Sequence, residues 1–193
     1  MGVRFGPDRG TKREPGVTGV IFMSESGLVD RSREDAWDDW YVEHLNTMVT
    51  VPGITSAQRF KTDTPGFPPS LAMYSVASRA VFDDPYYLSV RGLGEWRPLV
   101  DPCYYRRNLF AGLEHAPDVA GDECLVLADR DRPAGALHGI RFAWLEAVGI
   151  DRSTPHRGMA VLMPSAAFPL VHPLALYRPA TARITASSRE ENV

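Results

Sequence analysis

The sequence predicts an α+β fold in which a β-α-β-β-α-β unit is followed by a shorter second unit of the same kind. Apolar runs rich in β-branched residues alternate with stretches of helical periodicity between residues 17 and 113. Proline and glycine separate these stretches, as in the turn at Pro52 and Gly53. A comparable series of apolar landmarks returns about 104 residues further along the chain, which indicates an internal repeat.

The first unit is expected between residues 16 and 114. Its clearest element is the helix over 33–51, where Ser32 can cap the amino end and apolar residues recur at helical spacing. The helix expected over 83–96 is less regular, because Gly92 and Gly94 each cost about 1 kcal/mol relative to Ala. Strands are expected over 17–25, 54–62, 70–78 and 104–113. This order is typical of the split βαβ, or ferredoxin-like, arrangement, an antiparallel sheet with two helices on one face.

A second, shorter ferredoxin-like unit is expected between residues 122 and 187. It would contain strands over 123–128, 156–163 and 174–177 and a helix over 137–148. The landmark pairs that support the repeat are Val20–Phe22 with Leu125–Leu127, Trp40 with Trp144, and the LAMY ending at Tyr74 with the LALY ending at Tyr177. The alternative is a chance resemblance between apolar strands. Two real halves would let one sheet pack on the other within a single chain, between a flexible segment at 1–15 and a polar tail at 188–193.

Composition and missing motifs exclude several classes of function. The 193 residues carry 21 Lys and Arg against 24 Asp and Glu, so no basic surface favours nucleic acid. No apolar run reaches the ~18 residues that a membrane span requires. Cys103 and Cys124 show neither zinc-site spacing nor a disulfide framework, and a cytoplasmic location is expected. Phosphate-loop, dinucleotide-binding, nucleophile-elbow and zincin motifs are absent, and we expect no metal, nucleic acid or membrane as a partner.

His44 is the first candidate for a chemical role. It follows Trp40 by four residues and Tyr41 by three, on the apolar stripe of the expected helix, so its ring should face the sheet. Imidazole titrates near neutral pH and could take a proton from a carbon next to a carbonyl group. The alternative is a buried neutral histidine that only packs or hydrogen-bonds.

Tyr74 and Arg59 are the other candidate catalytic residues, because a hydroxyl and a guanidinium can both stabilise a developing enolate oxygen. Tyr74 has an alternative as a core residue, and Arg59 as the partner of a surface carboxylate. Aromatic and apolar side chains would form the wall of the substrate cavity. They are Trp37, Trp40, Tyr41, Met48 and Trp96.

A second concentration of aromatic and arginine residues begins in the less regular helix. Its members are Tyr86, Tyr87, Arg91, Trp96, Arg97, Tyr104, Tyr105, Arg106 and Arg107. Rings interleaved with guanidinium groups suit a flat, acidic ligand through stacking and bidentate contacts. They also suit an oligomer interface, since Tyr, Trp and Arg dominate interface hot spots, and the sequence favours the interface.

The stretch DDWYVEHLNTMVTVPGITSAQRF, followed by LAMY, resembles the dimeric α+β barrel superfamily, in particular EthD-like proteins with a WYxxHLP-type helix, a PG turn and a strand ending in RF. Asn46 stands where a proline is usual in that pattern. The resemblance covers roughly residues 17–113 and implies a sheet that packs on a partner sheet, with a pocket between helices and sheet. Activities in the superfamily include cofactor-independent monooxygenation, lactone isomerisation, polyketide cyclisation and heme degradation or binding. The resemblance does not choose among them.

We therefore expect a cofactor-independent enzyme of the isomerase, cyclase or lyase type, with His44 as the acid and base. Its substrate would be a small hydrophobic or aromatic carbonyl compound, it would use no cofactor, and its expected assembly is a homodimer. One alternative is a cofactor-free monooxygenase or a heme-binding barrel in which His44 is the axial ligand. Another is a non-catalytic ligand-binding or accessory barrel.

Overall fold

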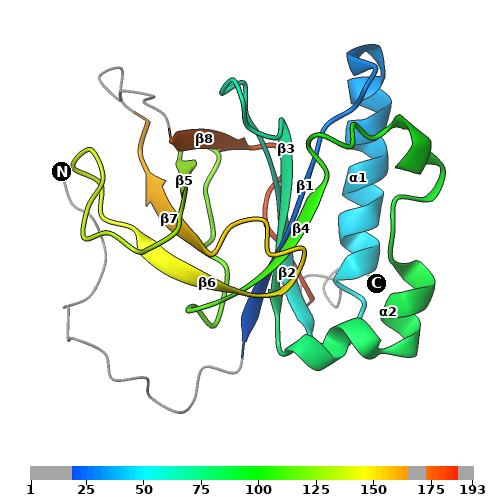
Figure 1. The fold of residues 1–193 in the computed structure, drawn as a ribbon. Helices are drawn as coiled ribbons and strands as arrows, with labels where there is room; N and C mark the ends of the chain where they lie inside the picture. Colours follow the sequence, from blue (N-terminus) through cyan, green and yellow to red (C-terminus); the bar gives the residue numbers. More distant parts are fainter. Residues whose placement is uncertain (1–18, 165–172, 187–193) are drawn as a thin grey trace.

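The computed structural model describes residues 19–164 and 173–186, and within them the chain forms a closed antiparallel barrel with helices on its outside (Figure 1). The predicted α+β class is confirmed. The expected flexible segment 1–15 and polar tail 188–193 lie outside the described residues. None of the helices in the described part of the chain is long and apolar enough to cross a membrane.

The first part of the chain supplies both α-helices and four of the strands. Its elements are β1 (Val20–Ser26), α1 (Glu34–Met48), β2 (Ile54–Lys61), β3 (Ser70–Val76), α2 (Pro85–Val90) and β4 (Arg106–Ala111). Short 3-10 helices lie at Arg31–Arg33, Arg79–Asp83 and Gly94–Leu99. These elements follow one another in the predicted order.

The second part of the chain supplies strands. They are β5 (Cys124–Arg130), β6 (Ala143–Ile150), β7 (His156–Leu162), β8 (Leu174–Pro179) and the short β9 (Ile184–Thr185). The ring of paired strands runs β3-β1-β4-β6-β7-β5-β8-β2 and closes where β2 pairs with β3, while β9 adds to the free stretch of β2. The first four strands lie in the order β4-β1-β3-β2 and the next four in the order β8-β5-β7-β6, which is the same relative order.

The helix predicted over 137–148 is wrong, because residues Ala143–Ile150 form β6. Side chains of this segment alternate between the two faces of a strand: Leu145 and Ala147 belong to the apolar cluster inside the barrel, while Trp144 packs outside it. The segment pairs with β4 on one side and β7 on the other, and these long-range hydrogen bonds override its helical periodicity.

Two of the three landmark pairs are also wrong as structural equivalents. Val20–Phe22 and Leu125–Leu127 lie on β1 and β5, which hold the same place in the two strand orders. Trp40, however, lies on α1 and Trp144 on a strand. Tyr74 lies on β3 and Tyr177 on β8. In the second strand order, however, β7 is the strand equivalent to β3, and β8 is equivalent to β4.

The barrel interior is mainly apolar, but it also holds buried polar side chains such as Gln58 and Asn108, and one buried ion cluster. Arg157 of β7 is almost fully buried, and its guanidinium lies 3.0 Å from the carboxylate of Glu25 on β1 and 2.7 Å from that of Asp129 on β5. The guanidinium also lies over the Phe110 ring, 5.2 Å from its centroid. Buried charges are tolerated only when they are paired in this way.

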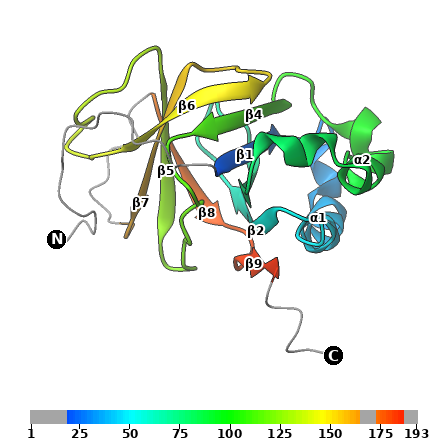
Figure 2. The same cartoon turned by 90° about the horizontal axis from the view of Figure 1, so that it is seen from below.

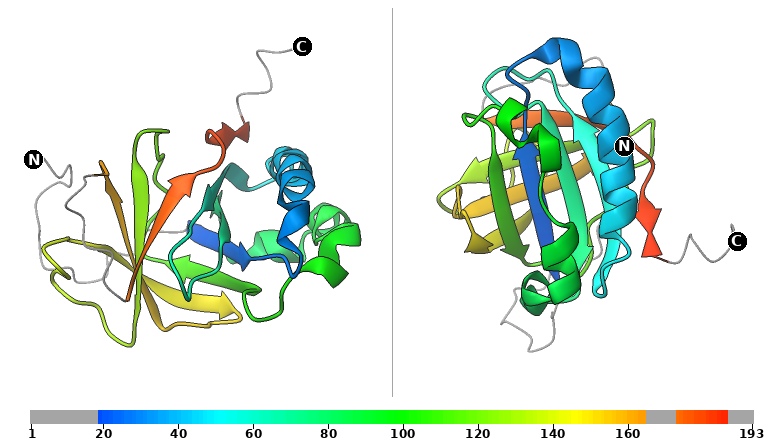
Figure 3. Two further views of the ribbon diagram at one scale, coloured as in Figure 1. Left: turned by 90° about the horizontal axis from the view of Figure 1, so that it is seen from above. Right: turned by 90° about the vertical axis from the view of Figure 1, so that its right-hand side faces the viewer.

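Within the described residues, the helices lie on the outer face of the first four strands, on the side of the barrel away from β5–β8 (Figures 2 and 3). Helix α1 presents its buried stripe to the sheet through Trp37, Tyr41, Leu45 and Met48, and each such side chain contributes about 1.5–3 kcal/mol by its burial. The helix gives way to β2 at Gly53, whose φ of +89° is the left-handed conformation that glycine adopts without strain.

The helix predicted over 83–96 is shorter than expected. Asp84 caps the amino end of α2, where its carboxylate accepts hydrogen bonds from the backbone N–H groups of Tyr86 and Tyr87. The chain leaves the helix after Val90, and Gly92 then takes a φ of +107°. Glycine therefore divides this region into α2 and a separate 3-10 turn, and the intervening loop forms one rim of the cavity described next.

Candidate functional site

A cavity of about 400 Å³ lies between the helices and the outer face of the sheet. Strands β1, β3 and β4 provide its floor, α1 and α2 its walls, and the loop after α2 its rim. The lining residues are Phe22, Ser24, Tyr41, His44, Met48, Tyr74, Tyr87, Arg91, Gly92, Leu93, Arg97, Tyr105 and Arg107. This volume falls in the range that small-molecule sites usually occupy.

Strand register brings the floor residues together. On β1, Phe22 lies opposite Tyr74 of β3 and Ser24 lies opposite Arg107 of β4. The Phe22 and Tyr74 rings are stacked, with centroids 5.4 Å apart. Tyr105 precedes Arg107 by two residues and therefore shares its face of the chain. The sheet thus presents three aromatic rings, the Ser24 hydroxyl and a guanidinium to one side.

His44 enters the cavity from α1. Its imidazole stacks on the Trp40 indole, with centroids 4.7 Å apart, and meets the Tyr41 ring edge-on at 5.9 Å. Burial lowers the pKa of His44 to about 4 from its usual 6.5. The ring is therefore neutral at physiological pH, and one ring nitrogen has a free lone pair.

Three tyrosines of the cavity hold their protons more tightly than usual. Burial raises the pKa of Tyr41, against the opposing charge of Arg59, and it raises the pKa of Tyr74 well above its normal value. Burial also raises the pKa of Tyr87, against the opposing charge of Arg91. Their hydroxyl groups consequently remain hydrogen-bond donors across the neutral and mildly alkaline range.

The predicted site residues divide between the cavity and its surroundings. Four of them line it: His44, Tyr74, Tyr41 and Met48. The other three aromatic residues stand outside it and form a stacked group, in which Trp37 lies 4.9 Å from Trp40 and 5.1 Å from Trp96. Trp40 therefore supports the imidazole from behind, and the other two belong to the core.

Arg59 does not line the cavity. Its buried guanidinium lies 2.7 Å from the Asp38 carboxylate of α1, donates to the Ser70 hydroxyl at 3.1 Å and covers the Tyr41 ring at 4.4 Å. It borders a separate pocket of only about 40 Å³. The strand itself explains this position, because Arg59 lies on β2, whereas the cavity floor is formed by β1, β3 and β4.

Sequence reasoning treated several lining residues as interface candidates. Tyr87, Arg91, Arg97, Tyr105 and Arg107 all belong to the aromatic and arginine group for which an interface was favoured, and all line the cavity. For two of them a signal was available in the sequence: on a strand, Tyr105 and Arg107 must point the same way, and the sheet face opposite the barrel interior is the one that helices cover.

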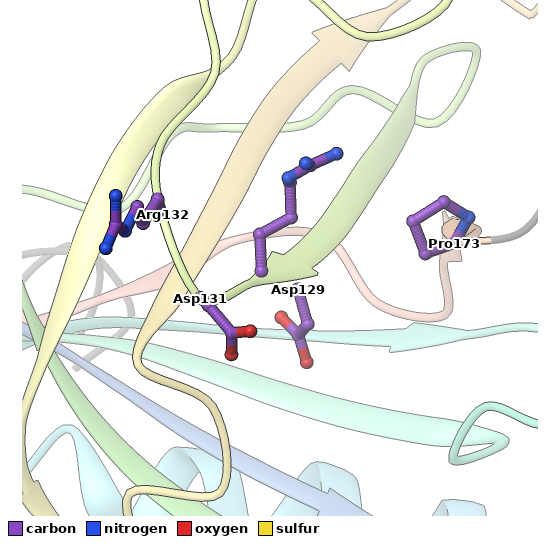
Figure 4. A pocket seen from close by; sticks show the side chains of 5 residues that line it. Asp129, Asp131, Arg132 and Pro173 are labelled. Atoms are coloured by element: carbon purple, nitrogen blue, oxygen red, sulfur yellow. The ribbon is translucent and has the colours of Figure 1, made fainter.

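A second depression, of about 440 Å³, opens at the end of β5 (Figure 4). It is lined by Asp129, Arg130, Asp131, Arg132 and Pro173. The Asp129 carboxylate is already bound to Arg157. Among the described residues, no group of three or more histidine, cysteine or acidic side chains is arranged to hold a metal ion.

Comparisons with known proteins leave the family open. No family model and no curated protein matches the chain. Among solved structures, the crystal structure of a chlorite dismutase-like protein matches with a TM-score of 0.48 and 9% sequence identity, over 84% of this chain and 95% of that one. A likeness at that level carries no weight for activity, and the fold stands on the strand pairing itself.

Proposed function

We propose that this protein is a small-molecule enzyme that moves a proton at a carbon next to a carbonyl group, as an isomerase, cyclase or lyase that uses no cofactor. The observation that carries the proposal is a neutral imidazole in the wall of an aromatic cavity of about 400 Å³. A base, hydrogen-bond donors and a compact space are what enolisation of a carbonyl compound requires.

His44 would act as the base. Its free nitrogen takes the proton from carbon, the C–H electron pair becomes the C=C bond of an enolate, and the carbonyl electrons move onto oxygen. The imidazolium that forms then returns the proton to a different carbon of the enolate, whose C=O bond reforms. In a lyase, the enolate electrons instead form a C=C bond to the neighbouring carbon, the bond to the leaving group breaks with its electron pair, and the leaving group takes the proton. Each step conserves atoms and electrons, so neither an oxidant nor a reductant is needed.

The enolate oxygen would be stabilised by Tyr74, Tyr41 and Arg107. The raised pKa values keep the two tyrosine hydroxyls protonated, and a developing oxyanion accepts hydrogen bonds more strongly than the carbonyl from which it forms. The role expected for Arg59 would pass to Arg107, because Arg107 lines the cavity and Arg59 acts only through its contact with Tyr41.

The second candidate is a non-catalytic ligand-binding barrel. It is favoured by the low pKa of His44, since a base with a pKa of about 4 drives proton transfer from carbon only weakly. A bound anion would raise the pKa of His44 and make it a stronger base. The two candidates therefore differ in whether the bound ligand raises this pKa enough for proton transfer.

For the architecture, we propose that each set of four strands is a ferredoxin-like unit and that the chain is a single-chain form of the dimeric α+β barrel. The identical relative strand order and the closure of the ring through β4–β6 and β8–β2 support this assignment. The second unit would then lack helices over residues 124–164 and 173–185. A cytoplasmic location stays part of the proposal and is supported by two unpaired cysteines.

The test is solvent deuterium exchange. The protein in D₂O is incubated with a library of aryl ketones, lactones and keto acids, and proton NMR follows loss of the signal next to the carbonyl. We expect His44→Gln to reduce exchange by about 10²–10⁴-fold, the usual contribution of a general base. His115→Gln removes an exposed histidine and serves as the matched control. Equal exchange by wild type and His44→Gln would refute the proposal.

Hemin titration separates the heme-binding alternative. A Soret band that appears with wild type and is lost in His44→Gln would indicate axial ligation by this histidine and would contradict the cofactor-independent mechanism. Binding of library compounds without exchange would instead support the non-catalytic barrel.

A further inference from the structure

We propose that the cavity is built for an organic anion, a small flat molecule whose carboxylate is held by Arg107 at the β4 side and whose rings lie among the tyrosines. This anion is the substrate class that we assign to the same site. Its role as a substrate rests on the proposed function. Binding of the anion is a separate claim with its own test.

The charge balance of the lining supports an anion. Three arginines line the cavity: Arg91, Arg97 and Arg107. The lining contains neither aspartate nor glutamate, and His44 is neutral at physiological pH. A cavity with an excess of fixed positive charge attracts anions and disfavours cations, because its low-dielectric walls concentrate the field.

Arg107 has donor capacity that the described residues do not use. Its Nε atom is buried and has no hydrogen-bond partner within the described part of the chain. Its terminal nitrogen is 3.9 Å from the Asp151 carboxylate, a long contact, and that carboxylate instead accepts a 2.7 Å hydrogen bond from the backbone N–H of Arg107. A buried donor without a partner is costly, and a bidentate ligand carboxylate would satisfy it.

Aromatic rings beside the arginines favour a planar body for the ligand. The Arg107 guanidinium lies 5.6 Å from the Tyr105 ring centroid and that of Arg91 lies 6.0 Å from the Tyr87 ring centroid, so each charged group is held against a π face. Phe22 stacks on Tyr74 in the floor. The hydroxyl groups of the cavity tyrosines and of Ser24 add donors, so the complementary ligand is rich in acceptors.

The volume limits the size of the ligand. A cavity of about 400 Å³ lies near the lower end of the range for small-molecule sites, which fits an aromatic or alicyclic acid of about one or two rings. Among such acids, one with a carbonyl group near the ring would place an acidic C–H bond within the same space as His44.

Binding is measured by calorimetry with matched probes. Benzoate, 1-naphthoate and phenylpyruvate are compared with benzamide and benzyl alcohol, which are similar in shape but uncharged, and with inorganic phosphate, which has charge without a ring. We expect at least one aromatic acid to bind at least about ten-fold more tightly than the uncharged analogues and than phosphate, and to weaken in high salt.

Arginine variants locate the anion. Arg107→Gln should weaken binding of the aromatic acid about ten-fold or more and leave binding of benzamide unchanged. Arg106→Gln is the matched control, since it removes the same charge from the adjacent, exposed residue of β4, which is not part of the lining. If Arg107→Gln does not fold, Arg91→Gln and the comparison of charged with uncharged probes on wild type still test the proposal.

Several results would overturn the inference. They are equal affinity for benzoate and benzamide, equal effects of Arg106→Gln and Arg107→Gln, and no binding of any aromatic acid up to about 10 mM, where even weak ligands register. The proposed function fails separately: tight anion binding without deuterium exchange would leave this inference intact, whereas exchange on neutral ketones with no preference for acids would overturn the inference alone.

Discussion

The imidazole of His44 lies parallel to the indole of Trp40, with ring planes 10° apart and centroids 4.7 Å apart. Both residues belong to α1, four positions apart, so the helix itself brings them face to face. The stack covers one face of the imidazole and leaves its edge at the cavity. Burial disfavours the charged imidazolium, which is the cause of the lowered pKa of His44.

The first prediction concerns stability in acid. The pKa of His44 falls from 6.5 to about 4 on folding. Between these two pH values, His44 is protonated in the unfolded chain and neutral in the folded chain. The stabilising contribution is therefore complete above about pH 6.5 and is lost as pH falls to about 4, a loss on the order of 3 kcal/mol.

Urea unfolding at pH 7 and pH 4.5 measures this loss. Wild type should lose more unfolding free energy than His44→Gln between the two values, because the variant has no group to protonate at that position. His115→Gln, which changes an exposed histidine, should behave as wild type. An identical pH dependence in all three proteins would contradict the assignment.

The second prediction links anion binding to proton uptake. A bound anion stabilises the imidazolium of His44 and raises its pKa from about 4, so affinity should increase as pH falls from 7 to 5. The other titratable groups of the lining are tyrosines and arginines.

Benzenesulfonate, which stays ionised, is the appropriate ligand for this measurement. Calorimetry in two buffers of different ionisation enthalpy should detect proton uptake by wild type. His44→Gln should bind with an affinity that does not depend on pH. A pH-independent affinity in wild type would show that the anion does not approach the imidazole.

The third prediction concerns the ion cluster inside the barrel. Arg157→Met would leave the Glu25 carboxylate buried without its partner and should lower the unfolding free energy by about 3–5 kcal/mol. The double variant Glu25→Gln/Arg157→Met should be more stable than Arg157→Met alone, because the fully buried carboxylate is removed and only the partly exposed Asp129 is left without its partner. Arg141→Met, at an exposed arginine, should change stability by no more than about 0.5 kcal/mol. Chemical unfolding of the three variants decides; a loss below about 1 kcal/mol for Arg157→Met would contradict the pairing.

The fourth prediction concerns the turn after α1. Gly53 has a φ of +89°, and an added Cβ would lie 2.6 Å from a methyl carbon of Val81. Gly53→Ala should therefore cost more than the roughly 1–3 kcal/mol of left-handed backbone strain alone. Gly66→Ala is matched to it, with a φ of +83° but nothing within 4 Å of the new methyl group. Thermal unfolding should show the larger loss for Gly53→Ala, and equal losses would exclude the steric contribution.

Local patterns predicted the elements of the first part of the chain well, because each has its own signal. The stripe of α1 and the turn at Pro52 and Gly53 fix that helix from neighbours in sequence alone. β6 could not be predicted from local patterns, because the spacing of its apolar residues is that of a helix. It forms a strand because it pairs with β4 and β7, which are distant in the sequence. The short β9 likewise exists only through its pairing with β2.

The candidate site shows the same division. His44 on the helix and Tyr74 on a strand were both expected in the catalytic site, and they line one cavity. Arg59 lies elsewhere because β2 is not part of the cavity floor and because Asp38 of α1 binds its guanidinium, a long-range pairing that the sequence does not reveal. The homodimer expected from the sequence stays a prediction; since the barrel closes within one chain, a second copy is not needed to complete the ring, and light scattering of the purified protein would decide.

The closed ring within one polypeptide also bears on how such a site can change. In a barrel made of two identical chains, every substitution occurs twice, once on each side. Here each residue occurs once per barrel, so the strands under the helices can acquire a charged, ligand-sized space without the same change in the opposite strands. A single occupied position per molecule is the expected stoichiometry.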